Sequence, residues 1–106
     1  MEPPTSYAPP IGLKATTLSA NSIILTWTDT SLGRNHRVTD DREYTIQYAP
    51  STGSQRSREV SVSATSMLIE ELRANTEYEF KVKIVMGDVE SFWSMTAVNT
   101  TFEESE

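Results

Sequence analysis

The 106-residue chain contains no cysteine, one histidine and only four glycines. The absence of cysteine excludes disulfides, thiolate metal sites and thiol catalysis, although a core of this size needs no disulfide even outside the cell. No apolar run approaches the ~20 residues of a membrane-spanning helix, and the polar opening does not resemble a signal peptide. We therefore expect one folded domain, cut from a longer polypeptide.

Positive charge is also scarce, because 9 Lys and Arg residues face 15 Asp and Glu residues and the net charge is -6. Nucleic-acid binding needs an excess of cations, so we expect no nucleic-acid partner. The basic residues nevertheless gather in two polar segments, and clustered cations bind polyanions such as heparan sulfate despite a negative total charge. Scattered solubilising charge is the alternative interpretation. The patch would consist of Arg34, His36, Arg37, Arg56 and Arg58.

Seven short segments, separated by turn-rich stretches, predict an all-β protein. Helical spacing persists nowhere for more than one turn. Within the stretch from Asn75 to Val85, charged and apolar residues alternate one by one from Glu77 to Ile84. Strands with one apolar and one polar face predict antiparallel sheets packed face to face, here a seven-stranded immunoglobulin-like β-sandwich. We expect a linker over residues 1–8, the domain over 9–102 and an acidic tail over 103–106.

The apolar faces of these strands define the expected core. Strand periodicity places every second side chain on the same face, so the inward set follows directly from the alternation. The predicted core residues are Ile23, Leu25, Trp27, Tyr44, Ile46, Tyr48, Leu72, Tyr78, Phe80, Val82 and Ile84.

Three features together resemble the fibronectin type III family. Trp27 ends the inward face of the second strand, tyrosines flank Ile46 in the third, and "LRANTEYEFKVKIV" is similar to the family's signature around its tyrosine corner. In such a corner the chain turns after Leu72, and the hydroxyl of Tyr78 reaches backbone groups upstream. Ala74 stands where the family often has proline. The resemblance covers essentially the whole chain and implies a non-catalytic β-sandwich.

A narrower resemblance rests mainly on "SFWSMTAVNTTFE", which is similar to the last, membrane-proximal type III domain of the DCC and neogenin family of netrin receptors. This resemblance implies an extracellular piece of a single-pass plasma-membrane receptor for axon guidance. Its implied partners are netrin or a repulsive guidance molecule, and neighbouring type III domains of the same chain. The segment "APSTGSQRSREV" matches poorly, so no partner residues are carried over there. A structural spacer, or a more general adhesion or cytokine-receptor module, remains the alternative.

Catalysis and metal binding have little support in the sequence. His36 lies among arginines, and nothing pairs it with a nucleophile and an orienting group. The acids between Thr39 and Glu43 are too few for calcium, which takes six to eight oxygen ligands. We therefore expect no enzyme, no cofactor and no metal. The long polar stretch from Asp29 to Glu43 is either a functional loop or a plain connection.

The turn in "VMGDVESFWSM" is the predicted ligand-binding site, since exposed aromatic and Met side chains suit protein recognition. For Trp93 the sequence favours an alternative, in which the indole packs across Lys81 and Lys83. The direction of Phe92 is left open. The predicted ligand-binding residues are Met86, Val89, Phe92 and Trp93.

Asn99 begins the sequence Asn-Thr-Thr, an N-glycosylation sequon. Because it falls on the last predicted strand, pairing with a neighbouring strand would hinder access to its side chain.

Overall fold

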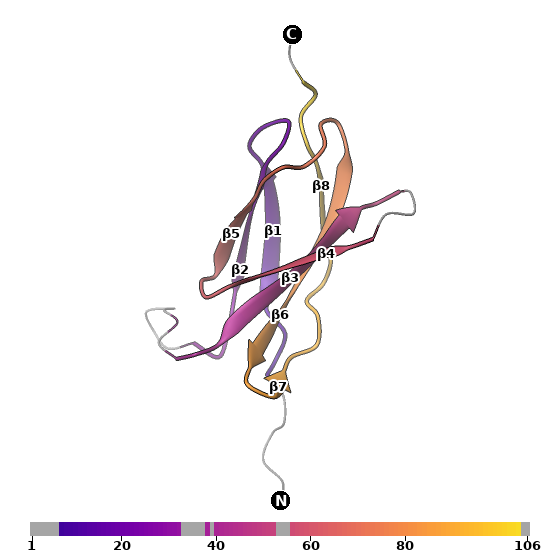
Figure 1. Cartoon of the computed structure of the whole chain (residues 1–106). Helices are drawn as coiled ribbons and strands as arrows, with labels where there is room; N and C mark the ends of the chain where they lie inside the picture. The colour runs from indigo at the N-terminus through magenta and orange to yellow at the C-terminus, as the bar shows by residue number, and fades with distance from the viewer. Residues whose placement is uncertain (1–6, 33–37, 39, 53–55, 105–106) are drawn as a thin grey trace, which may run out of the picture.

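The computed structural model describes residues 7–32, 38, 40–52 and 56–104, and within them it contains strands and no helix, so no described segment could cross a membrane as a helix. The strands pair antiparallel in two sheets that face each other (Figure 1). The first sheet has the order β1 (Ile11–Thr17), β2 (Ile23–Thr28), β5 (Ser66–Ile69). In the second, β4 (Arg58–Val62), β3 (Glu43–Pro50) and β6 (Glu77–Met86) are followed by β7 (Val89–Glu90) and β8 (Ala97–Thr100), which both pair with β6. The predicted all-β sandwich is confirmed.

The described residues form eight strands rather than seven, because a two-residue strand, β7, forms in the predicted turn before the expected last strand. β7 and β8 pair with opposite ends of β6 and are separated by residues 91–96. The turn between β6 and β7 contains only two residues, and Gly87 takes the positive φ of 61° that a tight hairpin requires.

The core forms where the cross-strand register brings the inward residues of β3 and β6 together. Tyr44 lies opposite Ile84, and both side chains are fully buried. Tyr48 is only half-buried, although its ring stacks on Phe80 with centroids 5.9 Å apart. Ile69, on the short strand β5, is a core residue that the alternation did not identify. The remaining core residues are as predicted: Ile23, Leu25, Trp27, Ile46, Leu72, Tyr78, Phe80 and Val82.

The tyrosine corner is present before β6. The backbone N–H of Arg73 donates to the hydroxyl of Tyr78 at 2.9 Å, and the Leu72 N–H donates to the carbonyl of Asn21 at the same distance. Asn75 takes a φ of 52°, a conformation that Asn tolerates better than most residues. The turn therefore forms with Ala74 in place of proline.

A buried ionic network closes the base of the long polar loop between β2 and β3. Asp29, 1% exposed, accepts hydrogen bonds from the Tyr44 hydroxyl at 2.7 Å and from Arg42 Nη1 at 2.8 Å. The Ser31 backbone and hydroxyl donate to its other oxygen. Arg42 also makes a bidentate pair with Asp40. The two ends of the loop are thus held together, while Arg34, His36 and Arg37 lie outside the described residues.

Candidate recognition surfaces

Residues 91–96, between β7 and β8, contact β6 at every third residue rather than every second. The Ser91 N–H donates to the carbonyl of Ile84 at 2.9 Å, and the Ser94 N–H donates to the carbonyl of Val82 at 2.8 Å. These two contacts lie three residues apart, whereas the side chains on one face of a strand lie two residues apart. Regular strand pairing with β6 is therefore interrupted between β7 and β8.

At each of these two positions, the backbone N–H and the hydroxyl of one serine take the place of the backbone groups that a neighbouring strand would offer to β6. The Ile84 N–H donates to Ser91 Oγ at 2.9 Å, and the Val82 N–H donates to Ser94 Oγ at 3.0 Å. Both hydroxyls donate onward to the carbonyl of the next residue. A serine thus supplies β6 with a donor and an acceptor, so no buried backbone group at these positions lacks a partner.

Trp93 lies on the outer face of β6. Its ring centroid is 5.1 Å from Lys81 Nζ and 4.7 Å from Lys83 Nζ, so one indole meets two cations. Lys83 also pairs with Glu90 of β7 at 2.8 Å. The structure therefore shows the stack that the sequence favoured for Trp93.

The predicted ligand-binding residues differ in what they offer a partner. Phe92 is 80% exposed, which answers the question that the sequence left open. Met86 and Val89 are half-buried cross-strand partners beside the hairpin turn, and the sulfur of Met86 accepts a hydrogen bond from Tyr7. Met95, which the sequence analysis did not select, is 90% exposed. The exposed apolar surface of this segment thus consists of Phe92 and Met95.

We expect the neighbouring aromatics Phe92 and Trp93 to respond differently to truncation. Trp93→Ala removes both cation–π contacts and should lower the free energy of unfolding by about 1–2 kcal/mol. Phe92→Ala removes an exposed ring and should change it by less than about 0.5 kcal/mol. Urea unfolding followed by tryptophan fluorescence measures both, since Trp27 remains in each variant, and equal losses in the two variants would contradict the assignment.

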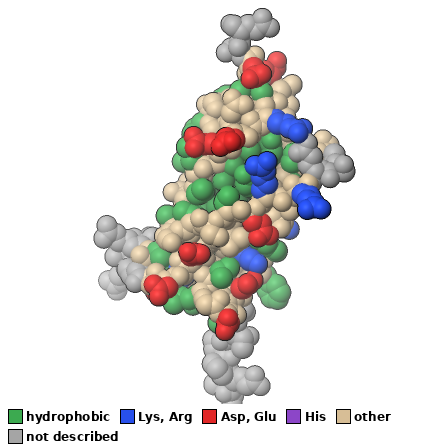
Figure 2. Space-filling model, viewed as in Figure 1, with side chains coloured by type: hydrophobic (Ala, Val, Ile, Leu, Met, Phe, Trp, Pro, Cys, Tyr) green, Lys and Arg blue, Asp and Glu red, His purple; other side chains and the backbone are tan. Residues whose placement is uncertain are grey.

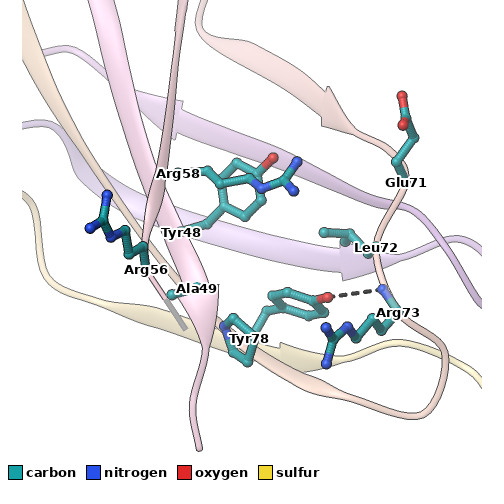
Figure 3. A pocket seen from close by; sticks show the side chains of 9 residues that line it. Tyr48, Ala49, Arg56, Arg58, Glu71, Leu72, Arg73 and Tyr78 are labelled. Carbon is teal, nitrogen blue, oxygen red and sulfur yellow. Dashed lines mark hydrogen bonds between the residues drawn. The ribbon is translucent and has the colours of Figure 1, made fainter. Parts of the chain in front are cut away.

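A second surface lies at the end of the sandwich nearer the C-terminus, where a cleft opens between β4 and the corner before β6. Figure 3 shows Arg58 beside Tyr48, its cross-strand partner, with Arg56 and Arg73 on two sides of the same cleft. Figure 2 shows basic side chains gathered on this part of the face. Two arginines of the predicted polyanion patch therefore line one cleft, and Arg73 joins them.

The Asn99 sequon is engaged in the structure. Asn99 Nδ2, the atom that a glycan would modify, donates to the carbonyl of Ala15 on β1 at 2.7 Å. The hydroxyl of Thr101, the third residue of the sequon, is buried and accepts from the Thr76 N–H at 3.0 Å. Asn99 and Thr101 thus each form a hydrogen bond with a segment distant in sequence, Asn99 with β1 and Thr101 with the turn before β6.

Across the described residues, no group of three or more His, Cys, Asp or Glu side chains is arranged to hold a metal ion. The buried Asp29 carboxylate and the two serine hydroxyls are hydrogen-bonded within the sandwich. The described surface thus carries a cleft lined by arginines and an exposed apolar segment.

The fold and these surfaces define an immunoglobulin-like β-sandwich module with a tyrosine corner. The chain belongs to the fibronectin type III domain family, whose sequence model matches residues 8–100. Among solved structures, the fn3 domain of human collagen alpha-1(XX) chain superposes with a TM-score of 0.77 at 24% identity, over 99% of this chain and 94% of that one. The FN5 domain of Drosophila Lar gives 0.74 at 19% identity, over 92% and 99%. These structural likenesses show the fold.

Two curated relatives are similar over nearly the whole chain. Neogenin from Homo sapiens is 39% identical over 101 residues, which are 94% of this chain and 7% of that protein. Netrin receptor DCC from Rattus norvegicus is 33% identical over 100 residues, 93% of this chain and 7% of that protein. The chain therefore spans about 7% of the length of the curated relatives it matches.

Proposed function

We propose that the chain is a non-catalytic module in the extracellular part of a single-pass plasma-membrane receptor, and that it contributes to binding netrin or a repulsive guidance molecule. The similarity to neogenin and to a netrin receptor over more than nine-tenths of the chain supports this proposal. Neighbouring type III domains of the same polypeptide are its further expected partners.

The observation that carries the binding role is the exposed segment between β7 and β8. Phe92 and Met95 are large apolar side chains in contact with solvent, and two serines fix the backbone that bears them. Aromatic and Met side chains are enriched at protein interfaces, and a preordered backbone loses little entropy on binding. These properties suit the binding of a protein ligand.

Titration of the chain, alone and extended by its preceding domain, against netrin and a repulsive guidance molecule tests the proposal. We expect saturable binding of at least one ligand by at least one of the two proteins. Binding by neither would favour the alternative function, a spacer that sets the distance between other domains and the membrane.

The arginine cleft favours a second function, the binding of a polyanion such as heparan sulfate. Arg56 and Arg58 follow each other at two-residue spacing and both line the cleft, beside Arg73. Guanidinium groups bind sulfate and carboxylate through paired N–H donors. The cleft therefore brings three arginines together with one acid, Glu71, in a protein whose net charge is -6.

We expect Arg58→Gln to elute from a heparin column at lower salt than the unsubstituted protein, since polyanion affinity falls with each lost cation contact. Lys14→Gln is the matched control, because it removes one exposed positive charge from β1, outside the cleft. If both variants elute at the same salt concentration, retention reflects overall charge and the cleft is not a polyanion site.

A further inference from the structure

Tyr7 lies in the segment that the sequence assigns to a linker, yet it packs against the core. Its side chain is half-buried and contacts the hydrophobic cluster. Its hydroxyl donates to the sulfur of Met86 at 3.4 Å, and the guanidinium carbon of Arg42 lies 5.3 Å from its ring centroid. One side chain therefore joins the N-terminal arm, the end of β6 and the base of the long loop.

Both groups that Tyr7 contacts are held in place by the fold. Arg42 forms ion pairs with Asp29 and Asp40, each at 2.8 Å. These pairs hold its guanidinium in place independently of Tyr7. Met86 pairs with Val89 in the β6–β7 hairpin. Figure 1 shows the segment that leads into β1 beside this hairpin, at the opposite end of the sandwich from the segment that follows β8.

The arm between Tyr7 and β1 is suited to an ordered conformation. Proline fixes its own φ, so the consecutive residues Pro9 and Pro10 lose little backbone freedom when the arm is ordered. Pro10 is buried, so the arm is attached to the sandwich at both of its ends.

We propose that Tyr7 is a latch that makes residues 7–10 part of the folded module, so that the rigid body begins at Tyr7 and not at β1. If residues 7–10 were free, a neighbouring domain could pivot at the start of β1, whereas the latch moves that pivot back to Tyr7. The consequence for a neighbour rests on the proposed function, but the latch itself does not.

Because the chain has no cysteine, the latch can be tested with two spin labels placed at engineered cysteines. One label replaces Ala8, an exposed residue of the arm, and the other replaces Thr16, an exposed residue of β1. Pulsed electron resonance gives the distance distribution between them. We expect a narrow distribution in the otherwise unsubstituted chain and loss of that narrow peak in Tyr7→Ala.

Two further variants complete the test. Tyr7→Phe keeps the ring over Arg42 and should retain the narrow peak, whereas Phe102→Ala removes an exposed aromatic after β8 and should leave it unchanged. Equal widths in the unsubstituted chain and in Tyr7→Ala would overturn the latch. Failure to bind netrin or a repulsive guidance molecule would overturn the proposed function, but it would not change the measured distance distributions that test the latch.

Discussion

Asp29→Ala is expected to lower the free energy of unfolding by about 3–5 kcal/mol, the cost of removing one partner from a buried ion pair. The Asp29 carboxylate is 1% exposed and is the shared acceptor for Arg42, Tyr44 and Ser31. Its removal leaves a buried guanidinium with Asp40 as its remaining carboxylate and leaves the Tyr44 hydroxyl without this acceptor. The same substitution removes the ion pair between Asp29 and Arg42 that joins the two ends of the long loop.

Urea unfolding of the variant measures this loss, and Asp40→Ala is the control. Asp40 pairs with the same arginine at the same 2.8 Å, but its side chain is partly exposed, so solvent can replace it. We expect the Asp40 variant to lose much less stability. Equal losses in the two variants would show that burial of the Asp29 pair is not the source of the effect.

The pH dependence follows from the pKa of Asp29. Burial raises this pKa, but the hydrogen bonds from Ser31, Tyr44 and Arg42 together outweigh burial and hold it below its ordinary value. Because the folded-state pKa is lowered, the stabilisation is fully present above the unfolded pKa of about 3.9. It is lost as the pH falls through the folded pKa. The stability difference between the unsubstituted protein and Asp29→Ala should therefore shrink below about pH 4.

The double variant Ser91→Ala, Ser94→Ala is expected to lose roughly 2–6 kcal/mol, since it leaves two buried backbone N–H groups without partners at about 1–3 kcal/mol each. Those groups belong to Val82 and Ile84 in the middle of β6. The segment that bears Phe92 should also detach from β6. Amide hydrogen exchange at Val82 and Ile84 should accelerate together with the loss of stability.

Thr96→Ala serves as the control, because it removes a hydroxyl from an exposed residue of the same segment. We expect its unfolding and its exchange rates on β6 to match those of the unsubstituted protein. A double serine variant that is as stable as the Thr96 variant would contradict the role given to the two hydroxyls.

The strands and most of the core could be predicted because their side chains alternate with a period of two. The spacing between Leu72 and Tyr78 predicts the tyrosine corner. The structure confirms the corner and the burial of both residues. The interruption at residues 91–96 could not be predicted in this way, because its period of three appears only when the two serines are matched to their partners on β6.

The ionic network and the latch were missed for a different reason. Asp29 and Arg42 are 13 positions apart within a polar stretch, where nothing distinguishes a buried charge from a solvated one. Tyr7 follows a proline-rich opening that is typical of a linker, and its contacts are with residues distant in sequence. Of the predicted recognition residues, Phe92 is exposed, while Met86 and Trp93 make the contacts within the module described above.

The affinity of Phe92→Ala, Met95→Ala for netrin or a repulsive guidance molecule tests the central claim most directly. Both side chains are exposed, so the variant should unfold at the same urea concentration as the unsubstituted protein. The account predicts that affinity for the ligand falls by about tenfold or more, as for hot-spot side chains at protein interfaces. Unchanged affinity for a ligand that the unsubstituted protein binds would contradict it.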